Sequence, residues 1–277
     1  MKVYETGNIR NIVVMGHGGC GKTTLVEAIA YQTGITARMG KVTDGNTISD
    51  YDKEEQKRQF SISTSVVPVE FEDIKINFLD TPGYFDFVGE VEEACHAAGA
   101  AVIVINGKSG VEVGTLKAWE LCEKYKLPRL FFVTGMDDDQ ASYRKIVLEL
   151  NDRFGRKVAP FHVPIRENEK FVGFVNVVKM KGRRFINDTS EYEECDIPDY
   201  MDKHLNISRD ALVEAVADTS EELMERYFAG EEFTYEEVST ALRTHVMDCQ
   251  IVPVLVGSGV HNQGTSTVFC SSSVSSV

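Results

Sequence analysis

Five short apolar runs, most of them separated by stretches with helical periodicity, constrain the fold of this 277-residue chain more than any other feature. The runs have the length of buried strands and cover residues 12–15, 74–79, 100–105, 130–133 and 251–256. Helices are expected at residues 22–33, 85–98, 111–126 and 141–154, several of them followed by glycine or proline. This alternation predicts an α/β fold with a doubly wound, mostly parallel sheet.

A glycine-rich octapeptide follows the first apolar run and opens the first expected helix. It reads Gly-His-Gly-Gly-Cys-Gly-Lys-Thr and satisfies the phosphate-loop pattern G-x-x-x-x-G-K-[ST]. In such a loop, glycines let backbone N–H groups surround phosphate oxygens, and the helix dipole favours negative charge. The lysine meets the β- and γ-phosphates, and the hydroxyl can bind Mg²⁺. The sequence therefore predicts a P-loop NTPase, with nucleotide contacts from Gly16, His17, Gly18, Gly19, Cys20, Gly21, Lys22, Thr23 and Thr24 and a catalytic cation at Lys22.

A second motif, Asp80-Thr81-Pro82-Gly83, ends the apolar run at residues 74–79. A carboxylate at this point can stand on the metal side of the phosphates. Gly83 has no Cβ, so its N–H can approach the γ-phosphate closely, and the following segment can shift when that phosphate leaves. The motif alone is weak, but it follows a phosphate loop, and the pair favours a nucleotide switch.

The segment from residue 34 to residue 61 is polar and ends in a charged run at residues 52–58. It shows no clear secondary structure, and we expect a long mobile surface loop. Connections of this length are uncommon in compact domains unless they are functional or disordered. Its place between the two motifs favours a functional loop.

The pattern changes after residue 157. Two strand-like pieces, at residues 161–165 and 172–180, precede an acidic, helix-rich stretch at residues 196–249. We expect a main domain of residues 1–157 and 251–264 and an inserted α+β subdomain of residues 158–250. Residues 265–277 are rich in serine and show no helical period, so they are expected to be a flexible end or a reading-frame artefact.

Charge and cysteine usage limit the partners and the compartment. The formal net charge is −14, so direct binding of this chain to nucleic acid is not expected. The amino-terminal residues lack the apolar core of a secretory signal, and no apolar run is long enough to span a bilayer, so we expect a cytoplasmic protein without membrane contact. The six cysteines form no C-x-x-C pair and are expected to be reduced; His17 and Cys20 are expected to fill the loop rather than to catalyse.

Together these motifs resemble the translational GTPases, and most closely elongation factor G and its divergent paralogues. The resemblance extends to about Gly264, and its inserted subdomain separates it from elongation factor Tu. The residues that carry it are Arg10-Asn11-Ile12, His17, Gly21-Lys22-Thr23-Thr24, Gly40, Asp44-Gly45, Asp80-Thr81-Pro82-Gly83, Asp86-Phe87, residues 111–115, Met136-Asp137, residues 174–180, Asp196-Ile197-Pro198, residues 220–224 and Gly257-Ser258.

The resemblance implies a nucleotide-binding G domain that uses GTP or GDP and Mg²⁺. It implies ribosome binding by the full-length protein, whose further domains lie outside this chain. By the same resemblance, the metal would be bound by Thr23, Ser61 and Asp80, and the guanine base by Thr134, Gly135, Met136, Asp137, Ser258 and Gly259.

Several positions depart from the family pattern. Thr134-Gly135 replaces the asparagine and lysine of the guanine motif, which puts base selectivity in doubt. Tyr84 stands where the family places a catalytic histidine, and Gly18 and Gly19 replace an aliphatic residue and an aspartate in the phosphate loop. We expect weak or absent hydrolysis, with Tyr84 at the catalytic position. Two alternatives stay open: a nucleotide-dependent ribosome-binding switch without appreciable hydrolysis, and a P-loop ATPase or kinase.

Overall fold

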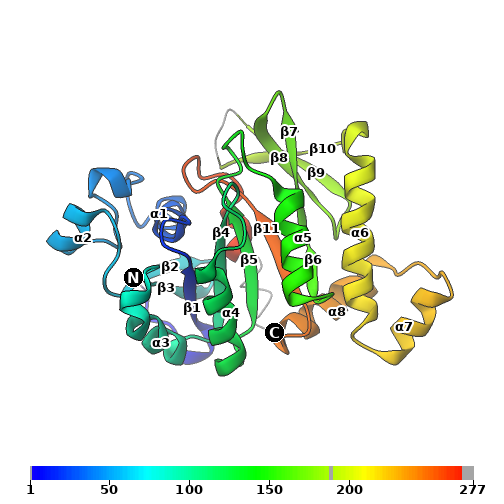
Figure 1. The fold of residues 1–277 in the computed structure, drawn as a ribbon, viewed down its shortest axis with the longest axis horizontal. Helices are drawn as coiled ribbons and strands as arrows, with labels where there is room; N and C mark the ends of the chain where they lie inside the picture. The colour runs from blue at the N-terminus through cyan, green and yellow to red at the C-terminus, as the bar shows by residue number, and fades with distance from the viewer. Residues whose placement is uncertain (1, 187–189, 270–277) are drawn as a thin grey trace.

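A computed structural model describes residues 2–186 and 190–269 and shows a seven-stranded sheet with helices on both faces (Figure 1). The strand order is β2-β3-β1-β4-β5-β11-β6, and β2 alone runs antiparallel to its neighbour. The predicted α/β fold with a mostly parallel sheet is confirmed. The strands are β1 (Ile9–Gly16), β2 (Ser65–Phe71), β3 (Ile74–Asp80), β4 (Ala100–Asn106), β5 (Arg129–Thr134), β6 (Val158–Pro160) and β11 (Val252–Val256).

Alternate side chains of β1 supply the cores on the two faces of the sheet. Val13 and Met15 face α3 (Val88–Ala97), α4 (Val113–Tyr125) and α5 (Tyr143–Phe154), whereas Ile12 and Val14 face α1 (Lys22–Gln32). Such alternation follows from the strand period of two, and it lets one strand bury both of its faces. The expected helices therefore cover the sheet from both sides. Single 3₁₀ turns lie at Thr6–Asn8, Val42–Asp44, Phe85–Phe87 and Asp199–Met201.

Two strands of the main sheet were not expected from the sequence. β2 lies at an edge of the sheet, where a proline is tolerated, and Pro68 within its apolar run argued against a strand in the sequence. β6 is a three-residue strand beside β11. It falls within residues 158–250, so the first residues of the expected insertion belong to the main sheet.

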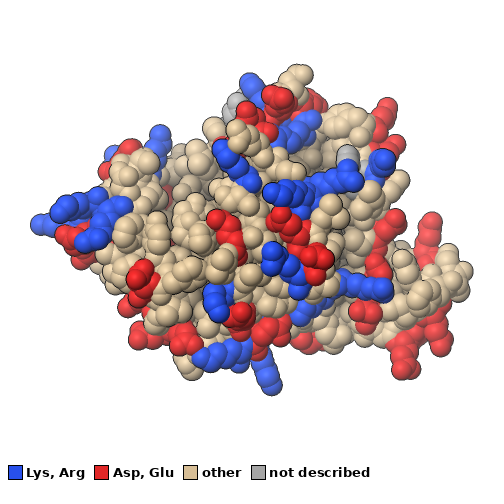
Figure 2. All heavy atoms as spheres, in the orientation of Figure 1, with Lys and Arg blue, Asp and Glu red and all other residues tan. Residues whose placement is uncertain are grey.

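The inserted region forms a four-stranded antiparallel sheet, in the order β10-β9-β8-β7, and three helices. It lies on the side of the main sheet away from α1 (Figure 1). Figure 2 shows acidic side chains gathered around α7 at its far end. β9 and β10 carry mostly polar residues, which hid them in the sequence. The elements are β7 (His162–Glu167), β8 (Lys170–Asn176), β9 (Lys181–Phe185), β10 (Tyr192–Cys195), α6 (Asp202–Ala217), α7 (Glu221–Phe228) and α8 (Tyr235–Met247).

The segment of residues 34–61 is more structured than expected. It contains α2 (Lys53–Arg58), which begins with a capping box between Asp52 and Glu55. Thr47, Ser49 and Asp50 are buried although the segment is polar. The expectation of a surface loop without secondary structure is therefore wrong, because the charged residues cap and anchor the segment internally.

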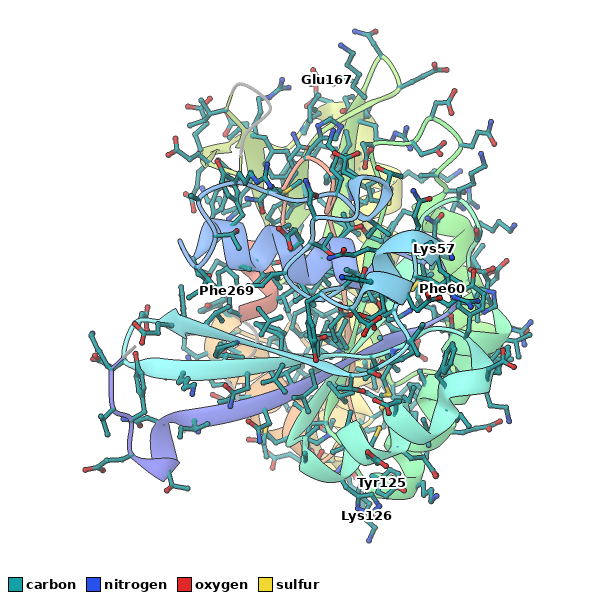
Figure 3. The ribbon with its side chains drawn as sticks, turned by 90° about the vertical axis from the view of Figure 1, so that its left-hand side faces the viewer. Lys57, Phe60, Tyr125, Lys126, Glu167 and Phe269 are labelled. Carbon is teal, nitrogen blue, oxygen red and sulfur yellow. The ribbon has the colours of Figure 1, made fainter. Side chains whose placement is uncertain are left out.

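The end of the chain also differs from the expectation. Residues 266–269 form a helical turn, and Val268 and Phe269 are buried in the core beneath α1. The ring of Phe269 lies 5.0 Å from that of Phe71 on β2 (Figure 3). A flexible or artefactual end is thus wrong for residues 265–269, since two apolar side chains there complete the core. Residues 270–277, with Cys270, lie outside the described residues; the other five cysteines are free.

Replacing Phe269 tests this role of the chain end. Phe269→Ala should lower the free energy of unfolding by about 3 kcal/mol, because it removes a buried ring from a packed core. Phe228→Ala is the control, since Phe228 on α7 is 78% exposed and its loss should change stability by less than about 0.5 kcal/mol. Urea unfolding measures both; equal, small effects would show that Phe269 does not belong to the core.

Candidate functional site

The glycine-rich loop joins the carboxyl end of β1 to the start of α1. Gly19 and Gly21 have φ values of 76° and 101°, which favour glycine, and Gly21 caps α1. A Cβ at Gly16 would lie 2.5 Å from the carbonyl oxygen of Val104 on β4. The glycines are therefore required by backbone conformation and by close packing, and the free N–H groups of α1 begin where the loop ends.

Carbonyl groups of the glycine-rich loop hold the side chain of Lys22 in place. Its side chain is buried, and Nζ donates hydrogen bonds to the carbonyl oxygens of His17 (2.9 Å) and Gly16 (3.2 Å). Gly83 lies beside it, since a Cβ there would be 2.4 Å from Nζ. The cation and the Asp80–Gly83 motif thus meet at one point, as the sequence predicted for a γ-phosphate site.

Two hydroxyl groups meet at the first turn of α1. Thr23 Oγ1 and Ser61 Oγ are 3.2 Å apart, and Ser61 donates a 2.7 Å hydrogen bond to Asp50 Oδ1. Burial raises the pKa of Asp50, and the Ser61 hydrogen bond opposes that effect. Two of the residues expected to bind the metal, Thr23 and Ser61, therefore lie side by side. Asp50 was not predicted, because its burial within a polar segment has no signal in the sequence.

Asp80 is a buried carboxylate beside these hydroxyls. It is 1% exposed, and the Ser49 and Thr23 hydroxyls lie close enough to lower its pKa, although neither carboxylate oxygen has a hydrogen-bond partner of good geometry among the described residues. Burial raises its pKa to about 6, although the charge of Lys22 acts in the opposite direction. A buried carboxylate without donors is costly unless a cation neutralises it, and hydroxyl and carboxylate oxygens are the ligands that Mg²⁺ prefers. The residues present therefore fit a magnesium ion.

Tyr84 covers the phosphate loop at Gly18. A Cβ at Gly18 would lie 3.3 Å from two atoms of the Tyr84 ring. The ring also packs on Phe60, with the ring centroids 4.8 Å apart and the rings tilted by 59°. Phe60, which is labelled in Figure 3, follows α2, so this contact joins the segment around Ser61 to the segment after Gly83. The tyrosine and the glycine are packed together, because a side chain at position 18 would crowd the ring and require it to shift.

His17 and Cys20 make structural contacts. His17 Nδ1 accepts a 3.3 Å hydrogen bond from the N–H of Gly114, and its Nε2 is 3.5 Å from Glu112 Oε1. The histidine therefore ties the phosphate loop to the start of α4. Cys20 is 1% exposed, and burial raises the pKa of its thiol, which disfavours the reactive thiolate.

The loops after β5 and β11 meet beside the phosphate loop. Thr134 packs on it, since a Cβ at Gly21 would lie 3.0 Å from Thr134 Cγ2. Thr134 Oγ1 accepts a 3.3 Å hydrogen bond from the N–H of Gly259, which itself lies against Thr24. A threonine hydroxyl thus holds the two loops together at the position where the family carries an asparagine amide.

The remaining predicted base contacts divide into core and surface positions. Met136 is fully buried in the main core, and Ser258 is 0% exposed. Asp137 is partly exposed, and its Oδ2 lies 3.7 Å from Nε2 of His261. The side chain that can face a base is therefore Asp137, with Gly135 beside it at a φ of 70°.

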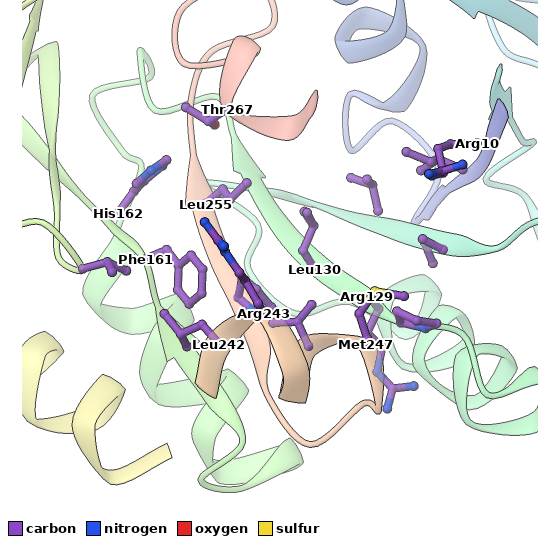
Figure 4. Close-up of a pocket in the computed structure, with 18 of the residues that line it drawn as sticks. Arg10, Arg129, Leu130, Phe161, His162, Leu242, Arg243, Met247, Leu255 and Thr267 are labelled. Carbon is purple, nitrogen blue, oxygen red and sulfur yellow. The ribbon is translucent and has the colours of Figure 1, made fainter. Parts of the chain in front are cut away.

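Two hollows lie at opposite ends of the main sheet. A cavity of about 190 Å³ is lined by Gly18, Lys22, Thr23, Ser61 and Tyr84 at the carboxyl ends of the strands. A larger cavity of about 780 Å³ lies at the amino ends of β1, β4 and β5, where Arg10, Phe161 and Arg243 are among its lining (Figure 4). Ligands of open α/β sheets bind at the carboxyl ends of the strands, so the smaller cavity marks the site.

Comparison with known proteins agrees with this geometry. The family described as the elongation factor Tu GTP binding domain matches residues 7–273. The chain belongs to this family. A crystal structure from Thermus thermophilus is similar to this GTP-binding domain at 35% identity with a TM-score of 0.86; the match covers 95% of the domain and 39% of the Thermus chain. Among the described residues, no helix is long and apolar enough to cross a membrane.

Asp80 gives a prediction that separates stability from function. Because its pKa rises from 3.8 to about 6 on folding, ionisation of Asp80 costs stability progressively as the pH rises from 3.8 to about 6, and the full cost is present above about pH 6. Without metal or nucleotide at pH 7.5, Asp80→Asn should therefore raise the free energy of unfolding by about 2 to 3 kcal/mol. The same change should weaken magnesium-dependent nucleotide binding.

Denaturant unfolding at several pH values and calorimetry with nucleotide and Mg²⁺ measure the two effects. The stabilisation should shrink as the pH falls below about 6 and disappear near about pH 3, where Asp80 is protonated in both the folded and the unfolded state. A variant that is less stable than the wild type at pH 7.5 would contradict the assignment of Asp80 as an uncompensated buried carboxylate.

Proposed function

We propose that this GTP-binding domain is the nucleotide switch of an elongation-factor-G-like translational GTPase with slow intrinsic hydrolysis. The observation that carries the proposal is the convergence of Lys22, the Thr23–Ser61 pair, Asp80 and Gly83 on the start of α1. These groups supply a cation for phosphate, oxygens for Mg²⁺ and a close backbone approach for the γ-phosphate. Since the domain spans 39% of the Thermus chain, the activity and partners of a whole protein are part of the proposal.

Magnesium, when bound, would neutralise charge on the phosphates. Thr23 and Ser61 would supply hydroxyl oxygens, and the buried carboxylates of Asp80 and Asp50 would stand on the same side. Ser61 and Gly83 belong to different segments, and the contact of Phe60 with Tyr84 joins those segments. A change at the γ-phosphate can thus reach both segments at once, which is the property of a switch.

Slow hydrolysis follows from the residues that would surround the water attacking the γ-phosphate. A phenol can form a hydrogen bond but cannot become a cation, so Tyr84 cannot replace the charge of a protonated histidine. Its ring lies on Gly18, in the space that an aliphatic side chain would otherwise fill. Phosphoryl transfer depends on positioning and charge stabilisation, and misplacing the water costs about 10²-fold in rate.

Guanine recognition in this proposal relies on Asp137. Its carboxylate can accept two hydrogen bonds from the base in a charge-assisted pair. Thr134 still joins the two base-side loops, but Gly135 has no side chain to cover the base. The ribosome as partner and a cytoplasmic location are proposed from the family, and the domain itself is acidic, with a net charge of −14.

Base selectivity tests the nucleotide assignment. GDP should bind more tightly than ADP in calorimetry, and Asp137→Ala should remove most of that difference because the guanine donors lose their acceptor. Thr134→Asn with Gly135→Lys should tighten GDP binding, since each regained buried hydrogen bond is worth about 1 to 3 kcal/mol. Equal affinity for ADP and GDP in the wild-type domain would favour the P-loop ATPase or kinase alternative.

The packing of Tyr84 on Gly18 predicts a coupling between these two positions. Tyr84→His alone should raise single-turnover GTP hydrolysis only slightly, because Gly18 leaves the histidine without a neighbour. Gly18→Ile alone should weaken nucleotide binding, since its Cβ would start 3.3 Å from the tyrosine ring. The double variant should be faster than both by about 10²-fold.

Hydrolysis with and without ribosomes in the longer protein completes this test. Rapid wild-type turnover on ribosomes that neither variant improves would contradict slow hydrolysis. Ribosome binding that depends on GTP without measurable turnover, even in the double variant, would favour the switch that does not hydrolyse GTP.

A further inference from the structure

Glu27 is a buried carboxylate that none of the proposed phosphate or metal contacts uses. It lies in α1, four residues after Thr23, so both side chains share one face of the helix. It is 2% exposed. A charged group is rarely buried to this extent unless it is paired or fully hydrogen-bonded, so its contacts indicate its role.

Each oxygen of Glu27 holds one end of the same loop. Oε1 accepts a 2.7 Å hydrogen bond from the N–H of Gly40, and Oε2 accepts a 2.7 Å hydrogen bond from the N–H of Ile48. Within this 40–48 loop, the N–H of Lys41 donates to Asn46 Oδ1 at 2.7 Å. One carboxylate therefore closes the loop that follows α1 in the chain, through two charge-assisted hydrogen bonds.

Gly40 provides an independent sign of this clamp. A Cβ at position 40 would lie 2.4 Å from the carbonyl oxygen of Asn46 and 2.9 Å from Glu27 Oε1. Its φ is not in the left-handed region, so its backbone conformation does not require glycine. The glycine is needed because the loop and the carboxylate approach its backbone closely.

The residues after the 40–48 loop are held by other groups. Asp50, two residues beyond Ile48, accepts the hydrogen bond from Ser61 at the metal corner. Glu55 of α2 accepts hydrogen bonds from the N–H groups of Ile62 (2.8 Å) and Ser63 (3.1 Å). The polar segment thus consists of a part clamped to α1 and a part, residues 49–64, that is held mainly by Asp50 and Glu55, is tied to Glu90 of α3 through Thr64, and reaches the phosphate site.

We propose that Glu27 is a positioning residue that fixes the 40–48 loop on α1 and so places Asp50 and Ser61 beside Thr23. Because Thr23 and Glu27 share a helix face, the clamp ties the start of the switch segment to the helix that carries the phosphate loop. Residues 49–64 donate no hydrogen bond to Glu27, so the clamp does not itself hold the part of the segment that reaches the phosphate site. The inference rests on the proposed metal site for its functional part, whereas the clamp itself can be measured without nucleotide.

Hydrogen–deuterium exchange of the nucleotide-free protein tests the clamp. Glu27→Gln replaces one acceptor oxygen with a donor, and Gly40→Ala opens the clamp from the other side without changing its charge. Both should speed exchange of the amides of the 40–48 loop by about tenfold or more, the change expected when one hydrogen bond to a charged group is lost. Glu93→Gln and Gly89→Ala on α3 are the controls, since Glu93 is exposed and a Cβ at Gly89 meets nothing within 4 Å.

The magnesium dependence of GDP binding tests the positioning. With the clamp open, the Mg²⁺ concentration that gives half-maximal tightening of GDP binding should rise about tenfold, while affinity without Mg²⁺ should change little. Unchanged exchange of the 40–48 loop in both variants would overturn the clamp. Faster exchange with an unchanged magnesium dependence would overturn the positioning role, as would loosening spread over α1 and the sheet.

The test of the clamp can fail or succeed independently of the proposed function. If the wild-type protein binds no guanine nucleotide, the proposed function fails, but exchange in the 40–48 loop still shows whether the clamp exists. If Glu27→Gln does not fold, Gly40→Ala gives the same two measurements with the carboxylate intact.

Discussion

The close approach of several loops to the amino end of α1 is the constraint on which the site depends. Parallel strands bring the carboxyl ends of β1, β5 and β11 to one edge, and β3 ends beside β1. Backbone groups there must come closer than side chains allow, so glycine occupies positions 16, 21 and 83. Polar side chains that are far apart in the sequence, such as Lys22, Ser61 and Asp80, can then line one small site.

Two kinds of buried carboxylate perform different tasks around this point. Glu27 and Glu55 accept backbone hydrogen bonds, so their charge is compensated and they hold the segment in place. Asp80 has no such donors, and burial raises its pKa to about 6. The cost of burying this charge is a reason to expect a cation there. The same carboxylate lowers the stability of the metal-free protein and would bind the metal.

The departures from the family pattern are compensated locally. Tyr84 and Gly18 are complementary in size, and the Thr134 hydroxyl joins the loops that an asparagine amide would join. The sequence showed each substitution but not that Tyr84 and Gly18 touch, because they lie in separate segments. Asp50 and Glu27 were missed for the same reason: nothing local distinguishes a buried, bonded carboxylate from the exposed ones nearby.

The sequence by itself determined the central parallel strands, their helices and the phosphate loop, since strand and helix periodicity and the glycine motif are local patterns. It also indicated the inserted subdomain from a change in composition. Only the tertiary structure decided that β2 and β6 complete the sheet, that residues 265–269 belong to the core, and that the polar segment is anchored. These features depend on contacts between residues far apart in the chain, whose energy comes from burial and from hydrogen bonds that form only once the sheet and α1 are in place.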